Sequence, residues 1–236
     1  MPELRTSMNK YRTKLLIART LFPIVLLTLF VTAAASAETS ATAPAKQAAN
    51  ARTIVVPPVP EKLQVEAGNK VFLEGHGVGT QNYVCKPSGT GVAFVLFTPQ
   101  ATLFDDDGKQ LITHFFSPNP DEANTDPTVV AERMIRVTWQ DSQDSSSVFA
   151  KATQSATSVT DPTFVAPGAV AWLLLETKGT KKGPDGGDRL TKTTFIQRLN
   201  TSGGLAPTTG CTSSADLGNE AFVPYTANYF FYQKAD

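Results

Sequence analysis

Residues 101–116 read ATLF-DDDGKQ-LITHFF, and this stretch decides the fold class. Two short runs of apolar and β-branched residues, 101–104 and 111–116, flank a polar segment that contains Asp107-Gly108. An Asp-Gly pair between two such runs is typical of a β-hairpin, because glycine adopts a positive φ without steric cost. The stretch therefore predicts two antiparallel strands joined by a tight turn.

Similar short segments continue on both sides of this hairpin, rich in β-branched and aromatic residues and bounded by Gly, Pro, Asp or Asn. We predict about a dozen strands, at residues 53–56, 63–66, 71–74, 82–85, 92–98, 101–104, 111–116, 133–139, 147–152, 170–177, 193–199 and 228–232. Two runs, 93–97 and 171–175, are almost continuously apolar. We expect them to be central strands covered on both faces.

Helical periodicity is scarce in the sequence. Only residues 126–134 and 215–221 are candidate helices, and both are too short to cover a sheet by themselves. Regularly spaced strands without intervening helices predict an all-β fold, an antiparallel β-sandwich or barrel-like domain with long loops and at most one or two short helices.

The first 37 residues have the pattern of a cleaved signal peptide. Five basic residues precede an apolar run at 21–31, and Ala35-Ser36-Ala37 forms a small-residue cleavage site before Glu38. An uncleaved membrane anchor is the alternative, although the apolar run is short for a span and contains Pro23. We expect a secreted or periplasmic protein with no stable membrane insertion after cleavage.

The remaining chain divides into two parts by composition. Residues 38–52 are rich in Ala and Thr and lack aromatic residues, which predicts a disordered linker. Residues 53–236 have the composition and length of a single globular β domain. Cleavage removes five of the 21 basic and one of the 21 acidic residues, leaving 16 against 20, a net charge of about −4. Because no basic run is interleaved with aromatic residues, nucleic acid is not an expected partner.

The chain has two cysteines, Cys85 and Cys211. In an exported protein, two thiols without close neighbours predict a disulfide. A redox-active pair would need closely spaced thiols, and a zinc site would need further ligands at a regular spacing. The sequence supports neither alternative.

Two segments resemble cofactor or metal sites. GHGVGT at 75–80 is similar to a dinucleotide-binding loop, but another strand follows it instead of a helix, so we predict a glycine-rich bend between strands. Asp105 and Asp107 are weak candidates for calcium ligands in the hairpin turn, where neighbouring side chains point in alternating directions. We predict no metal and no cofactor.

His114, Asp144 and Ser145 supply the residue types of a general base, its orienting carboxylate and a nucleophile. The sequence lacks a Gly-x-Ser-x-Gly elbow, and the serines beside Asp144 are typical of a polar turn. A secreted hydrolase that uses His114 and Asp144 is therefore an alternative hypothesis.

The stretch QRLNTSGG at 197–204 is the strongest candidate for ligand binding. Gln197, Arg198 and Asn200, followed by the turn at Gly203 and Gly204, suit hydrogen bonding to a sugar hydroxyl or a carboxylate. A stacking face could come from aromatic residues elsewhere in the chain, namely Trp139, Trp172, Tyr225 and Tyr229. In the purely structural alternative, Arg198 pairs with a carboxylate across the sheet and Asn200 caps a turn.

Several of these segments occur together in a known family. They follow one another as 79–85 (GTQNYVC), 101–105 (ATLFD) with Gly108 and His114, Trp139 with 144–148 (DSSSV), 195–204 (FIQRLNTSGG) with Pro207 and Cys211, and 223–232 (VPYTANYFFY). This order of motifs resembles the exported domain-of-unknown-function family 3455 of bacteria and fungi. The resemblance covers nearly all of residues 53–232. It implies a secreted single-domain β protein without an established reaction.

One departure from the family pattern affects the candidate site. In the family, Gly-Pro and the tryptophan follow closely after the histidine, whereas here a long insertion separates His114 from Trp139. We expect its Pro-, Asp- and Asn-rich start, residues 118–127, to be a surface excursion. Whether His114 lies beside Trp139 is left open by the sequence.

These observations lead to one functional expectation and two alternatives. We expect an exported module that binds a small molecule or carbohydrate, or that interacts at a surface, through Gln197, Arg198 and Asn200 with an aromatic face. The alternatives are the hydrolase described above and a structural or stress-related envelope protein without a ligand. More of the sequence favours a non-enzyme than an enzyme.

Overall fold

A computed structural model describes residues 53–126 and 133–236 of the chain. The predicted signal peptide and linker lie outside the described residues, as does most of the predicted helix at 126–134. Within the described residues, Arg133 and Met134 belong to a strand. The residues from Thr53 onward that are described form one compact unit.

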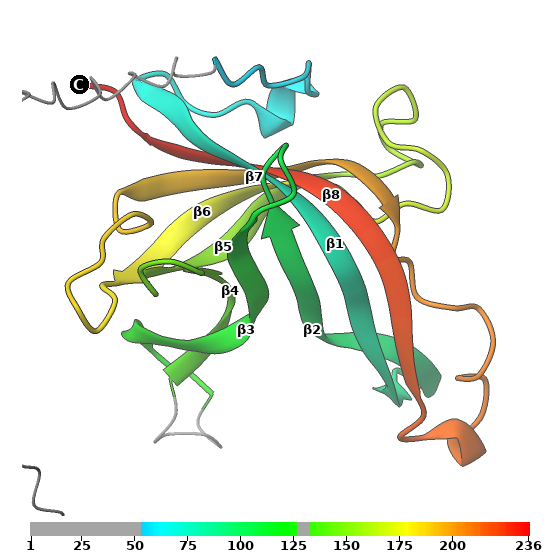
Figure 1. Ribbon diagram of the computed structural model, residues 1–236. Coiled ribbons are helices and arrows are strands. Elements are labelled where there is room, and N and C mark those ends of the chain that lie inside the picture. Colours follow the sequence, from blue (N-terminus) through cyan, green and yellow to red (C-terminus); the bar gives the residue numbers. More distant parts are fainter. Residues whose placement is uncertain (1–52, 127–132) are drawn as a thin grey trace, which may run out of the picture. The chain divides into compact units, whose positions relative to one another are not determined.

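The fold is all-β, and of the two predicted architectures it is the barrel (Figure 1). The described residues form eight strands: β1 (Asn69–Ser88), β2 (Gly91–Phe104), β3 (Gln110–Ala123), β4 (Arg133–Asp141), β5 (Ser147–Ala156), β6 (Trp172–Lys181), β7 (Thr193–Gly203) and β8 (Glu220–Lys234). Each strand pairs antiparallel with the next in sequence, and β8 pairs with β1 to close the barrel. Closure leaves no unpaired sheet edge around the circumference.

The strands are fewer and longer than predicted. The expected hairpin at 101–116 is confirmed as the β2–β3 connection, with Gly108 at φ 76°. The predicted strands 53–56 and 63–66 are wrong: the first is irregular, and Leu63 ends a short 3-10 helix, η1 (Glu61–Leu63). Prolines at 57, 58 and 60 lack the N–H groups that a strand ladder needs, which accounts for the irregular backbone.

The segment 75–80 is part of β1 and not the predicted bend between two strands. At Gly79 an added Cβ would lie 2.1 Å from the Gln100 carbonyl oxygen and 2.5 Å from the Ala101 Cα on β2. At Gly77 it would lie 2.8 Å from the Tyr229 ring. These glycines therefore allow a continuous strand to pass close to its neighbour and to a buried aromatic ring.

Replacing Gly79 should therefore disturb the β1–β2 pairing. For Gly79→Ala we expect a loss of about 1–3 kcal/mol or more in the free energy of unfolding, because the new methyl group meets backbone atoms that cannot rotate away. Gly91→Ala is the matched control, since its added Cβ would meet only the Ser88 carbonyl oxygen, 4.0 Å away. Urea unfolding checks this, and equal stabilities of the two variants would contradict the explanation.

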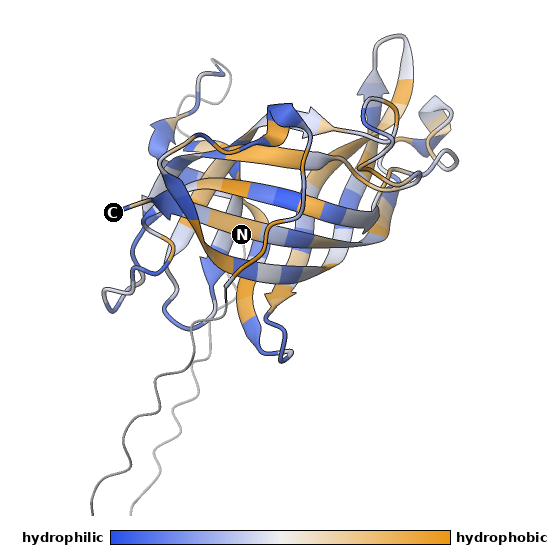
Figure 2. Cartoon of the chain, turned by 90° about the horizontal axis from the view of Figure 1, so that it is seen from above, coloured by the Kyte–Doolittle hydropathy of each residue, from blue (hydrophilic) through white to orange (hydrophobic). Residues whose placement is uncertain are grey.

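Two apolar clusters lie on opposite sides of the barrel wall. The inner cluster fills one half of the barrel interior and includes Leu103, Trp139, Val148, Ile196 and Phe231. The outer cluster lies between the outer face of β6–β8 and two covering segments, residues 54–65 and 164–172. Apolar and polar residues alternate along many of the strands (Figure 2).

The two apolar runs, 93–97 and 171–175, differ in how they are buried. In β6, Trp172 and Leu174 face the outer cluster while Leu175 faces the inner one, so this strand is covered on both faces as predicted. In β2 the prediction is wrong, because Val95 and Phe97 are 42% and 36% exposed. The paired ends of β1, β2 and β8 project beyond the rest of the barrel (Figure 1), so this part of β2 lacks a second covering layer.

The insertion between His114 and Trp139 begins as an ordered strand, and most of residues 118–126 are exposed, as expected of a surface segment. Strand β3 continues to Ala123, and Pro118 pairs with Ile135 on β4. The side chain of Asn119 is fully buried, and its Nδ2 donates to the Lys178 carbonyl oxygen on β6 at 3.1 Å. This long-range hydrogen bond holds the extended β3–β4 hairpin against β6, and an ion pair between Glu122 on β3 and Arg136 on β4 joins the two strands of the hairpin.

A disulfide joins Cys85 to Cys211, as predicted. It connects β1 to the loop 204–219, which also carries a second 3-10 helix, η2 (Ser214–Asp216). The predicted helix at 215–221 is therefore reduced to a single turn, and Glu220 already begins β8. The described residues contain no helix with the length and apolar character that a membrane span requires.

Candidate functional site

The barrel interior is packed at one end and hollow at the other. The hollow, here called the lumen cavity, has a volume of about 310 Å³. All eight described strands contribute to its lining, which comprises Gln81, Tyr83, Leu96, Pro99, His114, Phe116, Val137, Trp139, Ala152, Val170, Ala171, Leu173, Leu175, Arg198, Leu205 and Tyr229. Most of these side chains are aliphatic or aromatic. The size lies at the lower end of the roughly 300–1,000 Å³ range of ligand pockets.

Three aromatic residues close the cavity towards the packed half of the barrel. The rings of His114 and Trp139 are stacked, with centroids 4.3 Å apart and an angle of 17° between their planes. Tyr229 lies 5.3 Å from His114, measured between ring centroids, and Trp139 also packs edge-on against Phe231. His114 and Trp139 are directly opposite in the β3–β4 register, so the insertion does not separate them.

His114 is uncharged at neutral pH. Burial lowers the pKa of His114 to about 3, and the positive charge of Arg198 acts in the same direction. The Nδ1 atom lies 3.0 Å from the Thr138 carbonyl oxygen, so in the neutral ring Nδ1–H donates to that oxygen and Nε2 is left as an acceptor. The residue therefore adds polarity to the cavity without adding charge.

Arg198 is the only ionised side chain among the described residues that line the cavity. Ile196, two residues before Arg198 on β7, belongs to the inner cluster. Because side chains two apart on a strand lie on the same face, Arg198 also points into the barrel. The guanidinium donates from Nε and Nη2 to the Ala171 carbonyl oxygen, at 3.1 and 2.9 Å, and it also interacts with the Tyr229 hydroxyl. No described carboxylate forms an ion pair with Arg198, so the cross-sheet salt bridge of the purely structural alternative is not found among the described residues.

Tyrosine hydroxyls complete the polar part of the site. Tyr225 and Tyr229 share a hydrogen bond of 2.9 Å, and burial raises the pKa of both. Tyr83 donates to the Gly204 carbonyl oxygen at 2.6 Å, which holds the turn at the end of β7 near the mouth of the cavity. The indole Nε1 of Trp139 is buried and has no hydrogen-bond partner within the described part of the chain.

The predicted ligand-binding stretch is divided by the pleat of β7. Gln197 points outwards, where Nε2 donates to the Leu63 carbonyl oxygen and Oε1 accepts from the Tyr232 hydroxyl, each at 2.6 Å. Gln197 therefore fastens the covering segment to the barrel. Asn200 is exposed at φ 50°, and it does not line the lumen cavity.

Gly203 is the last residue of β7 and Gly204 follows it, with φ values of 68° and 86°. An added Cβ on Gly204 would lie 2.9 Å from side-chain atoms of Tyr225 and Val170. These glycines therefore shape the mouth of the cavity through the backbone. Of the six predicted ligand-binding residues, Trp139 and Arg198 line the cavity itself. Among the predicted aromatic partners, Tyr229 also lines it, whereas Trp172 belongs to the outer cluster.

The predicted catalytic residues are not brought together. Asp144 lies in the β4–β5 turn, where its carboxylate accepts from the backbone N–H groups of Ser146 and Arg189 at 2.8 and 2.9 Å. Those hydrogen bonds outweigh burial and lower its pKa. Ser145 occupies the same turn at φ 60°, while His114 bonds to Thr138 inside the barrel. Asp144 is thus a turn-stabilising residue in this structure.

The acidic hairpin at 105–107 also has a local structural role. Asp105 Oδ1 accepts from the backbone N–H groups of Asp107 and Lys109, at 3.1 and 2.8 Å, which stabilises the turn. Asp106 lies 2.9 Å from His76 Nε2. The described residues contain no group of three or more His, Cys, Asp or Glu side chains placed to hold a metal ion.

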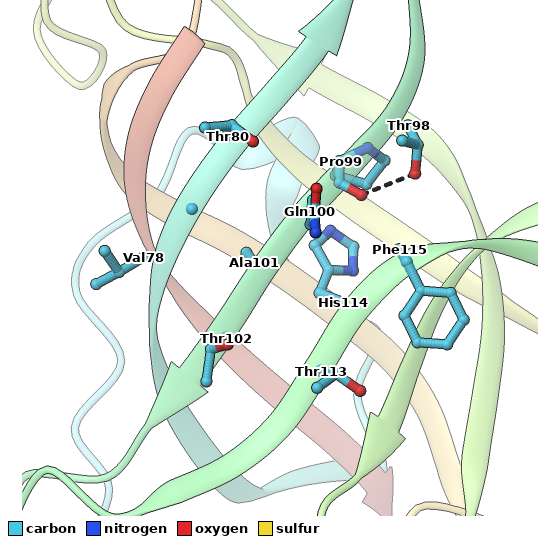
Figure 3. A pocket seen from close by; sticks show the side chains of 11 residues that line it. Val78, Thr80, Thr98, Pro99, Gln100, Ala101, Thr102, Thr113, His114 and Phe115 are labelled. Atoms are coloured by element: carbon cyan, nitrogen blue, oxygen red, sulfur yellow. Dashed lines mark hydrogen bonds between the residues drawn. The ribbon is translucent and has the colours of Figure 1, made fainter. Parts of the chain in front are cut away.

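A second hollow lies on the outer face of β1–β3 (Figure 3). It has a volume of about 580 Å³ and is lined largely by short side chains, including Val78, Thr80, Thr102 and Thr113. His114 and Pro99 line both hollows and stand between them. The outer hollow has no ionised side chain in its described lining, so the lumen cavity is the better candidate site.

Several residues that line the lumen cavity are not among the predicted site residues. Gln81 and Tyr83 lie in the segment 79–85, and Leu173 and Leu175 lie in the apolar run of β6. Their alternate spacing on each strand indicates a shared face, but it does not say which face is the lumen.

These features define a disulfide-bonded, closed antiparallel β-barrel with a mainly apolar cavity in its interior. The chain belongs to the family described as "Protein of unknown function (DUF3455)", whose model matches residues 66–233. This confirms the family that the sequence motifs indicate. Comparison with curated proteins and with solved structures gives no match.

Proposed function

We propose that this chain is an exported binding protein that holds a small, mainly apolar molecule in the lumen cavity. The observation that carries the proposal is the cavity itself, enclosed by all eight described strands and lined mostly by aliphatic and aromatic side chains. A barrel of eight strands has room for one small ligand where its interior is not filled by side chains. The Cys85–Cys211 disulfide supports an oxidising compartment outside the cytoplasm.

The lining favours a small molecule over a carbohydrate. Trp139 has no solvent exposure and already stacks on His114, so its ring is not available as a platform for a sugar. Carbohydrates also need many hydrogen-bonding partners, whereas ten of the sixteen lining residues of this cavity have no polar group in their side chains. No comparable arrangement supports the hydrolase alternative, since His114 and Asp144 belong to separate hydrogen-bonding networks.

The proposal predicts that filling the cavity abolishes binding. The neutral fluorescent probe N-phenyl-1-naphthylamine should bind the wild-type protein with an increase in its emission, because the probe moves from water to an apolar site. In Leu173→Trp the larger side chain occupies the cavity, and we expect the probe affinity to fall at least about tenfold while the protein stays folded.

Val159→Trp is the matched control, because Val159 is 89% exposed on the loop after β5. It should bind the probe like the wild type, and circular dichroism should show the same strand content in all three proteins. Wild-type protein that fails to bind the probe, or Leu173→Trp protein that binds it unchanged, would contradict the proposed site.

A further inference from the structure

We propose that the ligand of the lumen cavity carries a single carboxylate, which binds to Arg198. This inference rests on the proposed function and adds the chemical class of the ligand. The observation behind it is a guanidinium in a mainly apolar cavity with no described carboxylate as a partner.

The position of Arg198 calls for a counter-charge. Arg198 is partly buried, so its guanidinium loses part of its hydration, and removing a charge from water is costly unless an opposite charge compensates. The Ala171 carbonyl and the Tyr229 hydroxyl contact Arg198, and both are neutral. A guanidinium has more N–H donors than these contacts use, so its planar fork retains donors for a further partner.

The charge of Arg198 reaches much of the cavity without opposition. Burial raises the pKa of Tyr83, Tyr225 and Tyr229, and the charge of Arg198 offsets part of that rise. The same charge helps to keep His114 neutral. The cavity therefore has a positive potential in an apolar setting, where electrostatic attraction is stronger than in water.

The balance of charge selects a monoanion. Arg198 contributes one positive charge, and His114, the other basic side chain in the lining, contributes none at neutral pH. A phosphate monoester carries close to two negative charges at pH 7 and would be left partly uncompensated. A carboxylate carries one charge, and its two oxygens match the fork of the guanidinium.

The other lining residues indicate the chemical character of the rest of the ligand. Leu96, Val137, Val170, Leu173 and Leu205 line the same cavity as Arg198 and offer no hydrogen bonds through their side chains, and Leu205 is 47% exposed. The ligand is thus an amphiphile with an apolar body, such as a ring or a short hydrocarbon chain, and one carboxylate.

The test compares three compounds with the same apolar body: cinnamate, cinnamyl alcohol and cinnamyl phosphate. Each competes with N-phenyl-1-naphthylamine for the wild-type protein at pH 7, and calorimetry confirms the affinities. We expect cinnamate to bind about 10- to 100-fold more tightly than the alcohol, the range expected for a charge-assisted hydrogen bond. Cinnamyl phosphate should bind more weakly than cinnamate.

Variants then locate the source of the preference. Arg198→Gln should bind cinnamate and cinnamyl alcohol with similar affinity, and Arg198→Lys should keep part of the preference because it keeps the charge without the planar fork. Lys151→Gln removes one positive charge from an exposed position on β5 and should retain the full preference.

The outcomes separate the two proposals. If the wild type binds the neutral probe but does not prefer cinnamate over the alcohol, the carboxylate inference is wrong and the proposed cavity function stands. A phosphate that binds best also overturns the inference. If the wild type binds neither the probe nor any cinnamyl compound, the proposed function fails together with the inference. The wild-type comparison decides these points even if an Arg198 variant does not fold.

Discussion

A variant that lacks the Cys85–Cys211 disulfide, Cys85→Ser with Cys211→Ser, should lose about 5 kcal/mol of unfolding free energy. The two cysteines are 126 residues apart in sequence, so the cross-link closes most of the described domain into one loop. In chain-entropy models, a loop of this length restricts the unfolded chain by about that amount. Since domains are typically stable by about 5–15 kcal/mol, the variant should be marginal at room temperature.

The disulfide also has a local effect, because of where Cys85 lies. It is in the part of β1 that projects with β2 and β8 beyond the rest of the barrel, and it fastens the loop 204–219 to that projection. The loop begins beside Leu205, at the mouth of the lumen cavity. We therefore expect faster proteolysis within this loop in the variant, in addition to the global loss of stability.

Guanidinium unfolding of the wild type and the double variant, each with and without dithiothreitol, measures the effect. The reductant should destabilise the wild type towards the stability of the variant and should leave the variant unchanged. A double variant as stable as the oxidised wild type would show that the cross-link does not restrict the unfolded chain in the way described.

The sequence was sufficient for the fold class, for the β2–β3 turn and for the disulfide. Asp107-Gly108 specifies its turn through glycine's freedom at positive φ, and the cysteine pair needs no knowledge of topology beyond an oxidising compartment. The sequence predicts four strands too many: the segments 53–56 and 63–66 are not strands, 92–98 and 101–104 form the single strand β2, and 71–74 and 82–85 form β1, which runs through Gly75, Gly77 and Gly79 without a break. A glycine-rich segment can be either a bend or a strand that passes close to a neighbouring strand. The close approach of Gln100 and Ala101 on β2 to Gly79 identifies it as a strand, and the sequence alone does not show that approach.

The candidate site was predicted only in part, and β7 shows why. A strand with one face in water alternates between polar and apolar residues, and that alternation identifies its inward face. Strand β7 is covered on both faces, by the inner cluster and by the segment around Leu63. Gln197 and Arg198 therefore looked like partners in one site, although one fastens the outer covering and the other lines the lumen.

Acid pH should destabilise the protein through His114. The pKa of His114 is about 3 in the folded protein, where burial disfavours the charged ring, and 6.5 in the unfolded chain. Between these values the unfolded chain binds a proton that the folded protein does not, so the free energy of unfolding falls as the pH falls. The loss approaches about 1.4 kcal/mol per pH unit and totals on the order of 5 kcal/mol by pH 3.

The other titrating groups leave a window in which His114 dominates. Carboxylates with lowered pKa values, such as Glu122 and Asp144, stabilise the folded protein at neutral pH. They lose that stabilising contribution as the pH falls below their ordinary pKa values of about 4. His76 acts in the opposite direction: burial lowers its pKa, but hydrogen bonds to Asn228 and Asp106 raise it above 6.5 overall. Its contribution is fully present below pH 6.5 and is lost as the pH rises through the folded pKa.

Urea unfolding at intervals from pH 4.5 to pH 6 therefore isolates His114. The wild type should lose stability steadily towards pH 4.5, and His114→Phe, which keeps a ring beside Trp139 but does not titrate, should show a much flatter dependence. His76→Gln removes the other histidine and should keep the wild-type slope. If the stability of His114→Phe still falls with pH as steeply as that of the wild type, another group takes up the proton. The charge balance proposed for the lumen cavity, which requires a neutral His114, would then lose its support.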